Sequence, residues 1–240
     1  MNLSRALVSE FIGSAFLLAA VVGSGALAHK LDMGNIALSV LCVSFATMGT
    51  LTALIYALGT CSAHFNPVVT LALAVRKEFS WRNVPAYILA QIVGACTGVI
   101  ICNLMFDLPA ICISDTVRGG TGQLIGEVVA TFGLLGVIFG TAKNPANPGP
   151  IAIPLYVAGA IFFTSSTCFA NPAVTIARTL TTTLCGIEPA SVIPFIGAQI
   201  VGASAALAVF GWLFQTNSSS IEKLEEAYRE SPDLDSLKTS

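Results

Sequence analysis

Charged residues are scarce in this chain. Asp, Glu, Lys and Arg make up 10% of its 240 residues, whereas a soluble domain carries about 25%. Hydrophobic residues make up 55%, and the mean hydropathy is +0.81. The net charge of −2 provides no basic surface for a nucleic acid. These values exclude an ordinary soluble domain and indicate a protein that crosses a membrane several times.

Motifs of several other protein classes are missing as well. The seven Cys residues stand at irregular spacings in apolar segments, which is not the pattern of a disulfide framework. The sequence contains no Cys-x-x-Cys pair, Cys/His cluster, phosphate-binding loop or Ser/His/Asp set. We therefore expect no metal, no cofactor and no enzymatic activity.

Long stretches without charge are present instead. No Asp, Glu, Lys or Arg occurs in four ranges: 33–75, 83–106, 144–177 and 189–221. A helix of about 20 apolar residues crosses a bilayer, so we expect an all-α membrane protein. Its six transmembrane helices are predicted at 6–28, 35–58, 83–106, 121–142, 150–168 and 189–213. Two further helical segments, 67–76 and 172–181, are too short to cross, and we call them half-helices.

The N-terminal segment combines a basic start, an apolar stretch and Ala-Leu-Ala, as a cleaved signal peptide would. Glu10 lies inside the apolar stretch, however, and this favours a retained span. The distribution of Lys and Arg predicts the sidedness. With a cytoplasmic N-terminus, eight of these residues lie inside and three outside; the three are Lys30, Arg118 and Arg178. We therefore expect both termini on the cytoplasmic side of the plasma membrane.

Two halves of the chain match each other in order. The segment "HFNPVVTLAL" at 64–73 pairs with "FANPAVTIAR" at 169–178, and "AQIVGA" occurs at 90–95 and again at 198–203. Each half contains three predicted spans, and an odd number places the second half upside down in the membrane. The sequence therefore predicts an inverted 3+3 repeat, with the site at the midplane where the halves meet.

These repeats divide the chain into four parts. Residues 1–106 form the first repeat, 107–120 an extracellular connecting loop, 121–213 the second repeat and 214–240 a cytoplasmic tail. The tail is polar and acidic, and capping-box spacing at Ser219 predicts a short surface helix within it.

The two Asn-Pro pairs mark the starts of the half-helices. Pro suits the first helical turn, because its missing N–H would be unpaired there, and it keeps the preceding residue out of the α region. Irregular backbone at membrane depth persists only inside protein or along a wet cavity. We therefore expect Asn66 and Asn171 to face a pore, where their amides donate hydrogen bonds to neutral molecules. The positive ends of the half-helices would repel cations there. A third copy at 144–146 precedes Pro148 and Pro150, which favours a cytoplasmic loop.

Two carboxylates are expected at membrane depth, where a charge is costly. Glu10 and Glu127 occupy equivalent places in the two halves, and each half has one re-entrant loop with unpaired N–H groups. We therefore interpret them as acceptors that brace these loops; the alternative is a proton-coupled secondary transporter that uses both. Gln91 and Gln199 suit the same bracing role or an ordinary interhelical hydrogen bond.

Small residues at four-residue spacing predict close helix crossings. Gly94 and Gly98 form a Gly-x-x-x-Gly motif, and Gly202 with Ala206 repeats it with small residues.

The paired Asn-Pro motifs, the duplicated Glu and the six-span inverted repeat together resemble the aquaporin (major intrinsic protein) family over 6–213. The resemblance implies a homotetramer in membrane lipid with one pore per subunit, which passively conducts water or small uncharged solutes. It also implies a pore centre whose members are Asn66, Pro67, Val68, Asn171, Pro172 and Ala173.

The resemblance further implies a narrow outer filter at Thr47, Gly159 or Ala160, Cys168 and Val174. Most of the family has Arg where this chain has Val174, and a bacterial subgroup with this Val is associated with arsenic handling. Small filter residues predict a wide aperture for glycerol, urea or un-ionised arsenite, as in an aquaglyceroporin without the filter Arg. A water-selective channel is the alternative.

Three more side chains are candidates near the pore. Arg178 lies one helical turn beyond Val174, so it either supplies a positive charge to the vestibule or stands on the outer surface. Cys168 is expected to react with mercury, and Cys61 is a competing target; both are alternatively small buried hydrophobes. His64 is expected at the inner mouth or as a hydrogen-bonded loop residue.

Overall fold

The computed structural model describes residues 2–214. Within this range the chain forms eight α-helices joined by loops. Their bounds are α1 Leu3–Leu31, α2 Ile36–Leu58, α3 Pro67–Val75, α4 Val84–Met105, α5 Gly120–Ala142, α6 Gly149–Phe163, α7 Pro172–Ala177 and α8 Pro189–Leu213. A 3-10 turn at Trp81–Asn83 precedes α4, and another at Arg178–Leu180 follows α7. The helix predicted near Ser219 lies outside the described residues.

The observed helices correct one predicted span. Five helices of residues 2–214, α1, α2, α4, α5 and α8, are long and apolar enough to cross a membrane. The span expected at 150–168 ends at Phe163, after 15 residues. Thr164 has extended backbone, and its Oγ1 accepts the N–H of Cys168 at 3.0 Å, so the chain turns there. The uncharged but hydroxyl-rich segment 164–168 (Thr-Ser-Ser-Thr-Cys) therefore belongs to a loop and not to a span.

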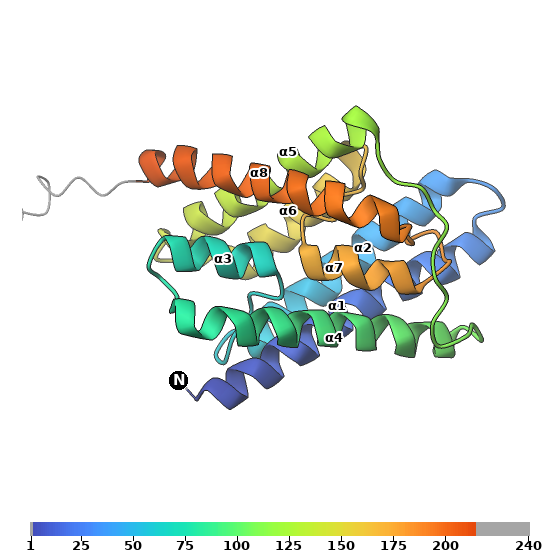
Figure 1. The fold of residues 1–240 in the computed structure, drawn as a ribbon, viewed down its shortest axis with the longest axis horizontal. Helices are drawn as coiled ribbons and strands as arrows, with labels where there is room; N and C mark the ends of the chain where they lie inside the picture. The colour runs from blue at the N-terminus through green and yellow to red at the C-terminus, as the bar shows by residue number, and fades with distance from the viewer. Residues whose placement is uncertain (1, 215–240) are drawn as a thin grey trace, which may run out of the picture.

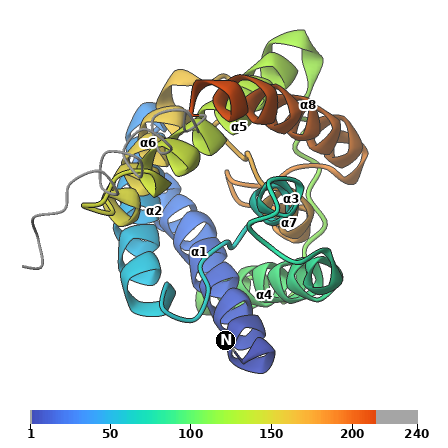
Figure 2. The same cartoon turned by 90° about the vertical axis from the view of Figure 1, so that its left-hand side faces the viewer.

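The two half-helices lie inside the molecule. Figures 1 and 2 show α3 and α7 lined up end to end, with the longer helices around them. Both pack between α4 and α8. The segment predicted as 172–181 is α-helical to Ala177 and tightens into the 3-10 turn at its end.

Helix packing repeats between the halves. Helix α1 packs against α2 and α4, and α5 packs against α6 and α8 in the same way. Contacts of α2 with α6, of α4 with α7 and of α3 with α8 join the two halves. Each half-helix thus packs against one long helix of each half, α4 and α8, as the predicted inverted repeat requires.

Close helix crossings occur at the predicted glycines. A Cβ added at Gly94 or Gly98 would overlap the backbone of Phe11 or Ala15 in α1. Gly202 stands equally close to the carbonyl oxygen of Val128, where α8 crosses α5. The Gly-x-x-x-Gly prediction is confirmed, since only a hydrogen at these positions allows the backbones to approach so closely.

We predict that Gly98→Ala destabilises the fold. The new methyl group would meet the backbone oxygen of Ala15, and a backbone atom cannot turn away as a side chain does. Overpacking of this kind costs about 1–3 kcal/mol, which should lower the thermal unfolding midpoint of the protein in detergent. Gly197→Ala is the matched control, because no atom lies within 4 Å of a Cβ there. Equal midpoints for the two variants would contradict the tight crossing.

Candidate functional site

A buried carboxylate holds the loop before α3. Glu10 on α1 is fully buried. Its Oε1 accepts hydrogen bonds from Ser62 Oγ at 2.6 Å and from the N–H of His64 at 2.8 Å. Its Oε2 accepts from the N–H of Phe65 and from Gln91 Nε2, both at 2.7 Å. Four hydrogen bonds compensate the cost of burying this carboxylate.

The second half repeats the arrangement. Glu127 on α5 is also fully buried, and its oxygens accept the N–H groups of Phe169 and Ala170, both at 2.9 Å. Gln199 donates to Glu127 at 2.6 Å and to Thr175 Oγ1 at 2.9 Å. Each carboxylate thus fastens one re-entrant loop to the long helix that begins its half.

The loops held in this way have unusual backbone conformations. Phe65, Thr167, Cys168 and Ala170 have φ values of 51°, 60°, 51° and 45°. Non-glycine residues in this left-handed region cost about 1–3 kcal/mol each, and they persist where surrounding contacts determine the backbone. The hydrogen bonds to the two carboxylates provide such contacts at Phe65 and Ala170, and Thr164 accepts the N–H groups of Thr167 and Cys168.

The same hydrogen bonds determine where the loop carbonyls point. In a planar trans peptide, the C=O is directed opposite to the N–H of the next residue. The N–H groups of residues 64, 65, 169 and 170 point at the carboxylates. The carbonyl oxygens of residues 63, 64, 168 and 169 therefore point away from them, and none accepts a hydrogen bond from within residues 2–214.

Each Asn caps the half-helix that it precedes. Asn66 Oδ1 accepts the N–H of Val68 at 3.0 Å, and Asn171 Oδ1 accepts the N–H of Ala173 at 2.9 Å. Both Asn residues have extended backbone, as the following Pro requires.

The two Asn amides also connect the halves across the centre. Asn66 Nδ2 donates to the carbonyl oxygen of Ala170, and Asn171 Nδ2 donates to that of Phe65, both at 2.8 Å. An amide nitrogen carries two N–H groups, so each Asn retains one N–H after this bond. The crossed bonds fix the direction of the remaining donor.

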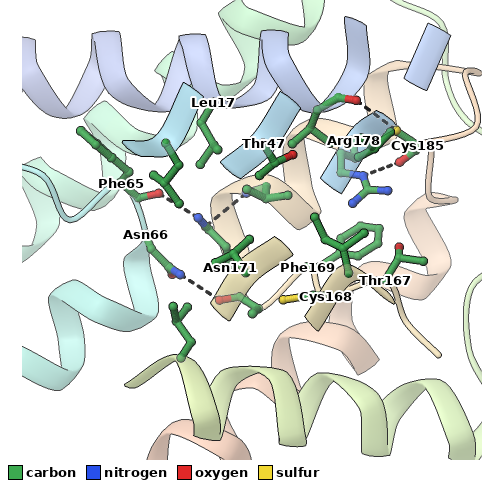
Figure 3. A pocket seen from close by; sticks show the side chains of 18 of the residues that line it. Leu17, Thr47, Phe65, Asn66, Thr167, Cys168, Phe169, Asn171, Arg178 and Cys185 are labelled. Atoms are coloured by element: carbon green, nitrogen blue, oxygen red, sulfur yellow. Dashed lines mark hydrogen bonds between the residues drawn. The ribbon is translucent and has the colours of Figure 1, made fainter. Parts of the chain in front are cut away.

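These donors meet an internal cavity of about 260 Å³. Figure 3 shows Asn66 and Asn171 near one another, with Phe65 toward one end and Arg178 and Cys185 toward the other. All four loop residues with free carbonyls also line the cavity. The facing wall is apolar; it includes Leu17, Val21, Val43, Leu51, Ile55, Leu134, Ile138, Ile153, Val157 and Ile161. The cavity therefore has a polar strip along one side and hydrocarbon along the other.

The predicted central residues fall into two groups. Asn66 and Asn171 line the cavity, whereas Pro67, Val68, Pro172 and Ala173 are buried without lining it. These four form the first turns of α3 and α7, so they position the Asn residues. Glu10, Glu127, Gln91 and Gln199 also lie outside the cavity lining.

Thr47, Cys168 and Val174 from the predicted filter line the cavity. The prediction for α6 is wrong, because neither Gly159 nor Ala160 lines it. Three other residues of α6 do so: Ile153, Val157 and Ile161. Their spacing of four residues places them on one face of the helix, and Gly159 projects to the opposite side.

Arg178 is not on the outer surface. Its side chain is 4% exposed, and it lines the cavity. Nε donates to the carbonyl oxygen of Cys185, and the guanidinium carbon stands 3.5 Å from the ring centroid of Phe169. The alternative of a surface cation is therefore wrong, because the segment after α7 folds back over this residue.

Two residues that line the same end were missed in the sequence. Arg118 and Cys185 come from loops far apart in the chain and meet near Arg178. No local motif marked them; the positive charge of Arg118 in the connecting loop was the available signal. Cys61, the competing thiol, does not line the cavity.

His64 lines the cavity at the end away from Arg178. Its Nδ1 lies 3.1 Å from Thr70 Oγ1, and its ring packs against Phe79 and Tyr87. The third Asn-Pro copy is a loop between α5 and α6, as expected, in which Asn144 Oδ1 accepts the N–H of Ala146 at 2.9 Å.

Six longer helices around two half-helices, with an internal cavity at their junction, define an α-helical membrane channel of the aquaporin fold. Comparison with known protein families agrees with this assignment. Residues 1–169 match the sequence profile of the family described as "Major intrinsic protein". The chain belongs to this family, which consists of channels and not of enzymes.

Known relatives extend over most of the chain. Aquaglyceroporin AqpS of Rhizobium meliloti is 41% identical over 215 residues, which cover 89% of this chain and 92% of the relative. Aquaporin NIP1-4 of Oryza sativa is 32% identical over 206 residues, with 83% and 73% covered. The crystal structure of the aquaglyceroporin from Plasmodium falciparum superposes with a TM-score of 0.67 over 92% of this chain and 99% of that chain. Because the identity is 16%, this last match shows that the two proteins share a fold and carries no information on the solute.

Proposed function

We propose that the chain is a passive channel for small uncharged solutes, with an aperture wide enough for glycerol, urea and un-ionised arsenite. The two-sided wall of the cavity carries this proposal. Carbonyl acceptors and the two Asn donors form one side, and aliphatic side chains form the other. A molecule such as glycerol has hydroxyls for the first side and a carbon chain for the second.

The residues at the narrow part support the wide aperture. Val174 stands three residues after Asn171, where the family resemblance implies Arg in most members, and it leaves the filter without a cation at that position. Thr47 is one of the residues of α2 that line the cavity, and it is also small. We assign Thr47, Cys168, Val174 and Ile161 as the filter, with Asn66 and Asn171 as the central donors. The name of the 41% identical relative, an aquaglyceroporin, agrees with this assignment.

Stopped-flow light scattering of proteoliposomes tests the proposal. Vesicles with and without the protein should be compared for water, glycerol, urea and arsenite at equal osmotic gradients. We expect the protein to accelerate the flux of all four, without saturation at high gradient. Acceleration of water alone would favour the water-selective alternative and contradict the wide filter.

A proton-coupled transporter is the alternative from another class. Glu10 and Glu127 do not line the cavity, and each accepts at least three hydrogen bonds from its loop and a Gln. This arrangement supports bracing. Uptake that a pH gradient drives against the solute gradient would contradict the channel.

We also infer a homotetramer in the plasma membrane with both termini cytoplasmic. Large hydrophobic side chains cover the outside of the long helices; examples are Phe16, Phe45, Leu89, Ile193 and Trp212. These faces suit lipid and neighbouring subunits. Mass determination of the detergent-solubilised protein tests the tetramer, and protease access to the C-terminus in oriented vesicles tests the sidedness.

We predict that mercury inhibits solute flux through two thiols. Cys168 and Cys185 both line the cavity, and a bound mercury at either would narrow it. Cys168→Ser and Cys185→Ser should each reduce the inhibition of glycerol flux, and the double variant should abolish it. Cys42→Ser is the control, because this thiol is exposed and lies outside the cavity lining. Full inhibition of the double variant would contradict the assignment.

A further inference from the structure

Two arginines line the same end of the cavity without a carboxylate partner. The ion pairs within residues 2–214 are those of His29 with Asp32 and of Arg76 with Glu78. Arg118 and Arg178 therefore form no ion pair within this range, at a place where burial makes a charge costly, and the Glu127 carboxylate acts on them only at longer range. Backbone carbonyls accept some of their hydrogen bonds, but these carry no full negative charge.

Arg178 leaves most of its donors free. Its side chain is nine-tenths or more buried, and Nε donates to the carbonyl oxygen of Cys185. A guanidinium has five N–H groups, and those on the two Nη atoms form no hydrogen bond within residues 2–214. Figure 3 shows the bond to Cys185, with Phe169 beside the guanidinium. The stacked ring and the Nε bond hold the side chain in place beside the cavity.

Arg118 is held against the same ring from another loop. Its Nε donates to the carbonyl oxygen of Gly186 at 2.7 Å, and Nη2 donates to that of Leu184 at 2.9 Å. Its guanidinium carbon lies 5.2 Å from the centroid of Phe169, so the two cationic carbons are no more than about 9 Å apart. Nη1 forms no hydrogen bond within residues 2–214.

We propose that Arg118 and Arg178 form a binding site for a small tetrahedral oxyanion, such as inorganic phosphate, at this end of the cavity. An oxyanion that accepts charge-assisted hydrogen bonds has its centre about 4 Å from a guanidinium carbon. One anion between the two arginines can thus bridge guanidinium carbons up to roughly 8 Å apart, which is close to the upper limit on their separation. It would also remove the repulsion between two like charges.

The anion should bind there without passing. Beyond the arginines it would meet Val174, Val157 and Ile161, which offer no donor to replace its hydration. The free carbonyl oxygens of Cys168 and Phe169 would repel it. A bound oxyanion therefore occupies the solute path, and we expect phosphate to inhibit the flux of neutral solutes. In this respect the inference rests on the proposed function.

Two measurements test the site. Isothermal titration calorimetry of phosphate into the detergent-solubilised protein should show saturable binding of one phosphate per chain, which chloride at equal ionic strength does not produce. In proteoliposomes with phosphate on both sides, glycerol flux should fall with rising phosphate and not with chloride. Each flux is divided by that of the same protein without phosphate, so that differences in basal flux cancel.

Variants assign the binding to the two arginines. Arg118→Gln removes one charge, and Arg178→Lys keeps the charge but loses the two-pronged donor set. Each should raise the dissociation constant and the half-inhibitory concentration of phosphate about tenfold, as the loss of one charge-assisted interaction implies. Arg82→Gln is the control, because this Arg is exposed and outside the cavity lining, and it should leave both values unchanged.

The outcomes separate the alternatives. Absence of phosphate binding would overturn the proposal and leave the arginines as braces for the loop at 184–186. Equal binding by the wild type, Arg118→Gln and Arg178→Lys would overturn it as well, since the anion would then lie elsewhere. Absence of glycerol flux would contradict the proposed function, while calorimetry would still decide whether the anion site exists.

Discussion

Replacing Val174 with Arg is expected to reduce glycerol and urea permeability about tenfold or more, while water flux persists. Val174 lines the cavity and is 6% exposed, so a longer side chain there must extend into the solute path. In a tight site, one added methylene changes the discrimination between molecules of different size by about tenfold. The new guanidinium would also donate hydrogen bonds to water. Stopped-flow rates for water, glycerol and urea on the same vesicles measure the change.

Val174→Leu is the matched control for this substitution. It adds one methylene and no charge, so we expect a smaller loss of glycerol flux and no gain in selectivity for water. Glycerol rates in Val174→Arg vesicles that equal those of the wild type would show that the narrow part of the path lies elsewhere. Thr47 or Ile161 would then be the next candidate, because both line the cavity.

Glu127→Ala is expected to prevent recovery of folded protein. The substitution leaves three buried N–H groups without an acceptor: those of Phe169 and Ala170 and one of the two on Gln199 Nε2. Each unsatisfied buried donor costs about 1–3 kcal/mol, whereas folded proteins are stable by about 5–15 kcal/mol in total. The loop with positive φ at Ala170 would also lose the contacts that hold it. Yield of monodisperse protein and its unfolding midpoint are the measurements.

Glu78→Ala provides the comparison. Glu78 pairs with Arg76, and its side chain is 45% exposed. An exposed ion pair contributes about 0–1 kcal/mol, so this variant should be recovered as the wild type is. Glu127→Gln should be intermediate, since its carbonyl oxygen still accepts one loop N–H. A Glu127→Ala variant with the yield and unfolding midpoint of the wild type would contradict the bracing role and would favour the transporter alternative.

Much of the architecture could be predicted because its causes are local. Apolar stretches of about 20 residues must form helices in a membrane, since no other open structure satisfies their backbone there. Pro67 and Pro172 restrict the residues before them, and this places the helix starts at Asn66 and Asn171. The repeated order of Glu, Asn-Pro and Gln indicated which residues would meet, although they are far apart in the chain.

The filter could be predicted only in part. Cys168 and Val174 are close to Asn171 in the sequence, so the turn that places the Asn also places them. On α6 the relevant face depends on where the helix ends, and that end was concealed because residues 164–168 carry no charge. A shift of two residues turns a helical side chain by more than half a circle, so Gly159 was predicted where Ile161 lies.

The amino-acid sequence is enough to specify the class of protein, the positions of five long helices, the two half-helix starts and the bracing carboxylates. Hydrophobicity, proline geometry and internal repetition specify these features within short segments. The tertiary structure alone decided the end of the cavity that contains the arginines. The loops before α5, α7 and α8 meet there. Backbone carbonyls of Leu184, Cys185 and Gly186 in the loop before α8, together with the ring of Phe169, hold Arg118 and Arg178 in place. Contacts between distant loops set the direction of these side chains, and no local pattern encodes such contacts.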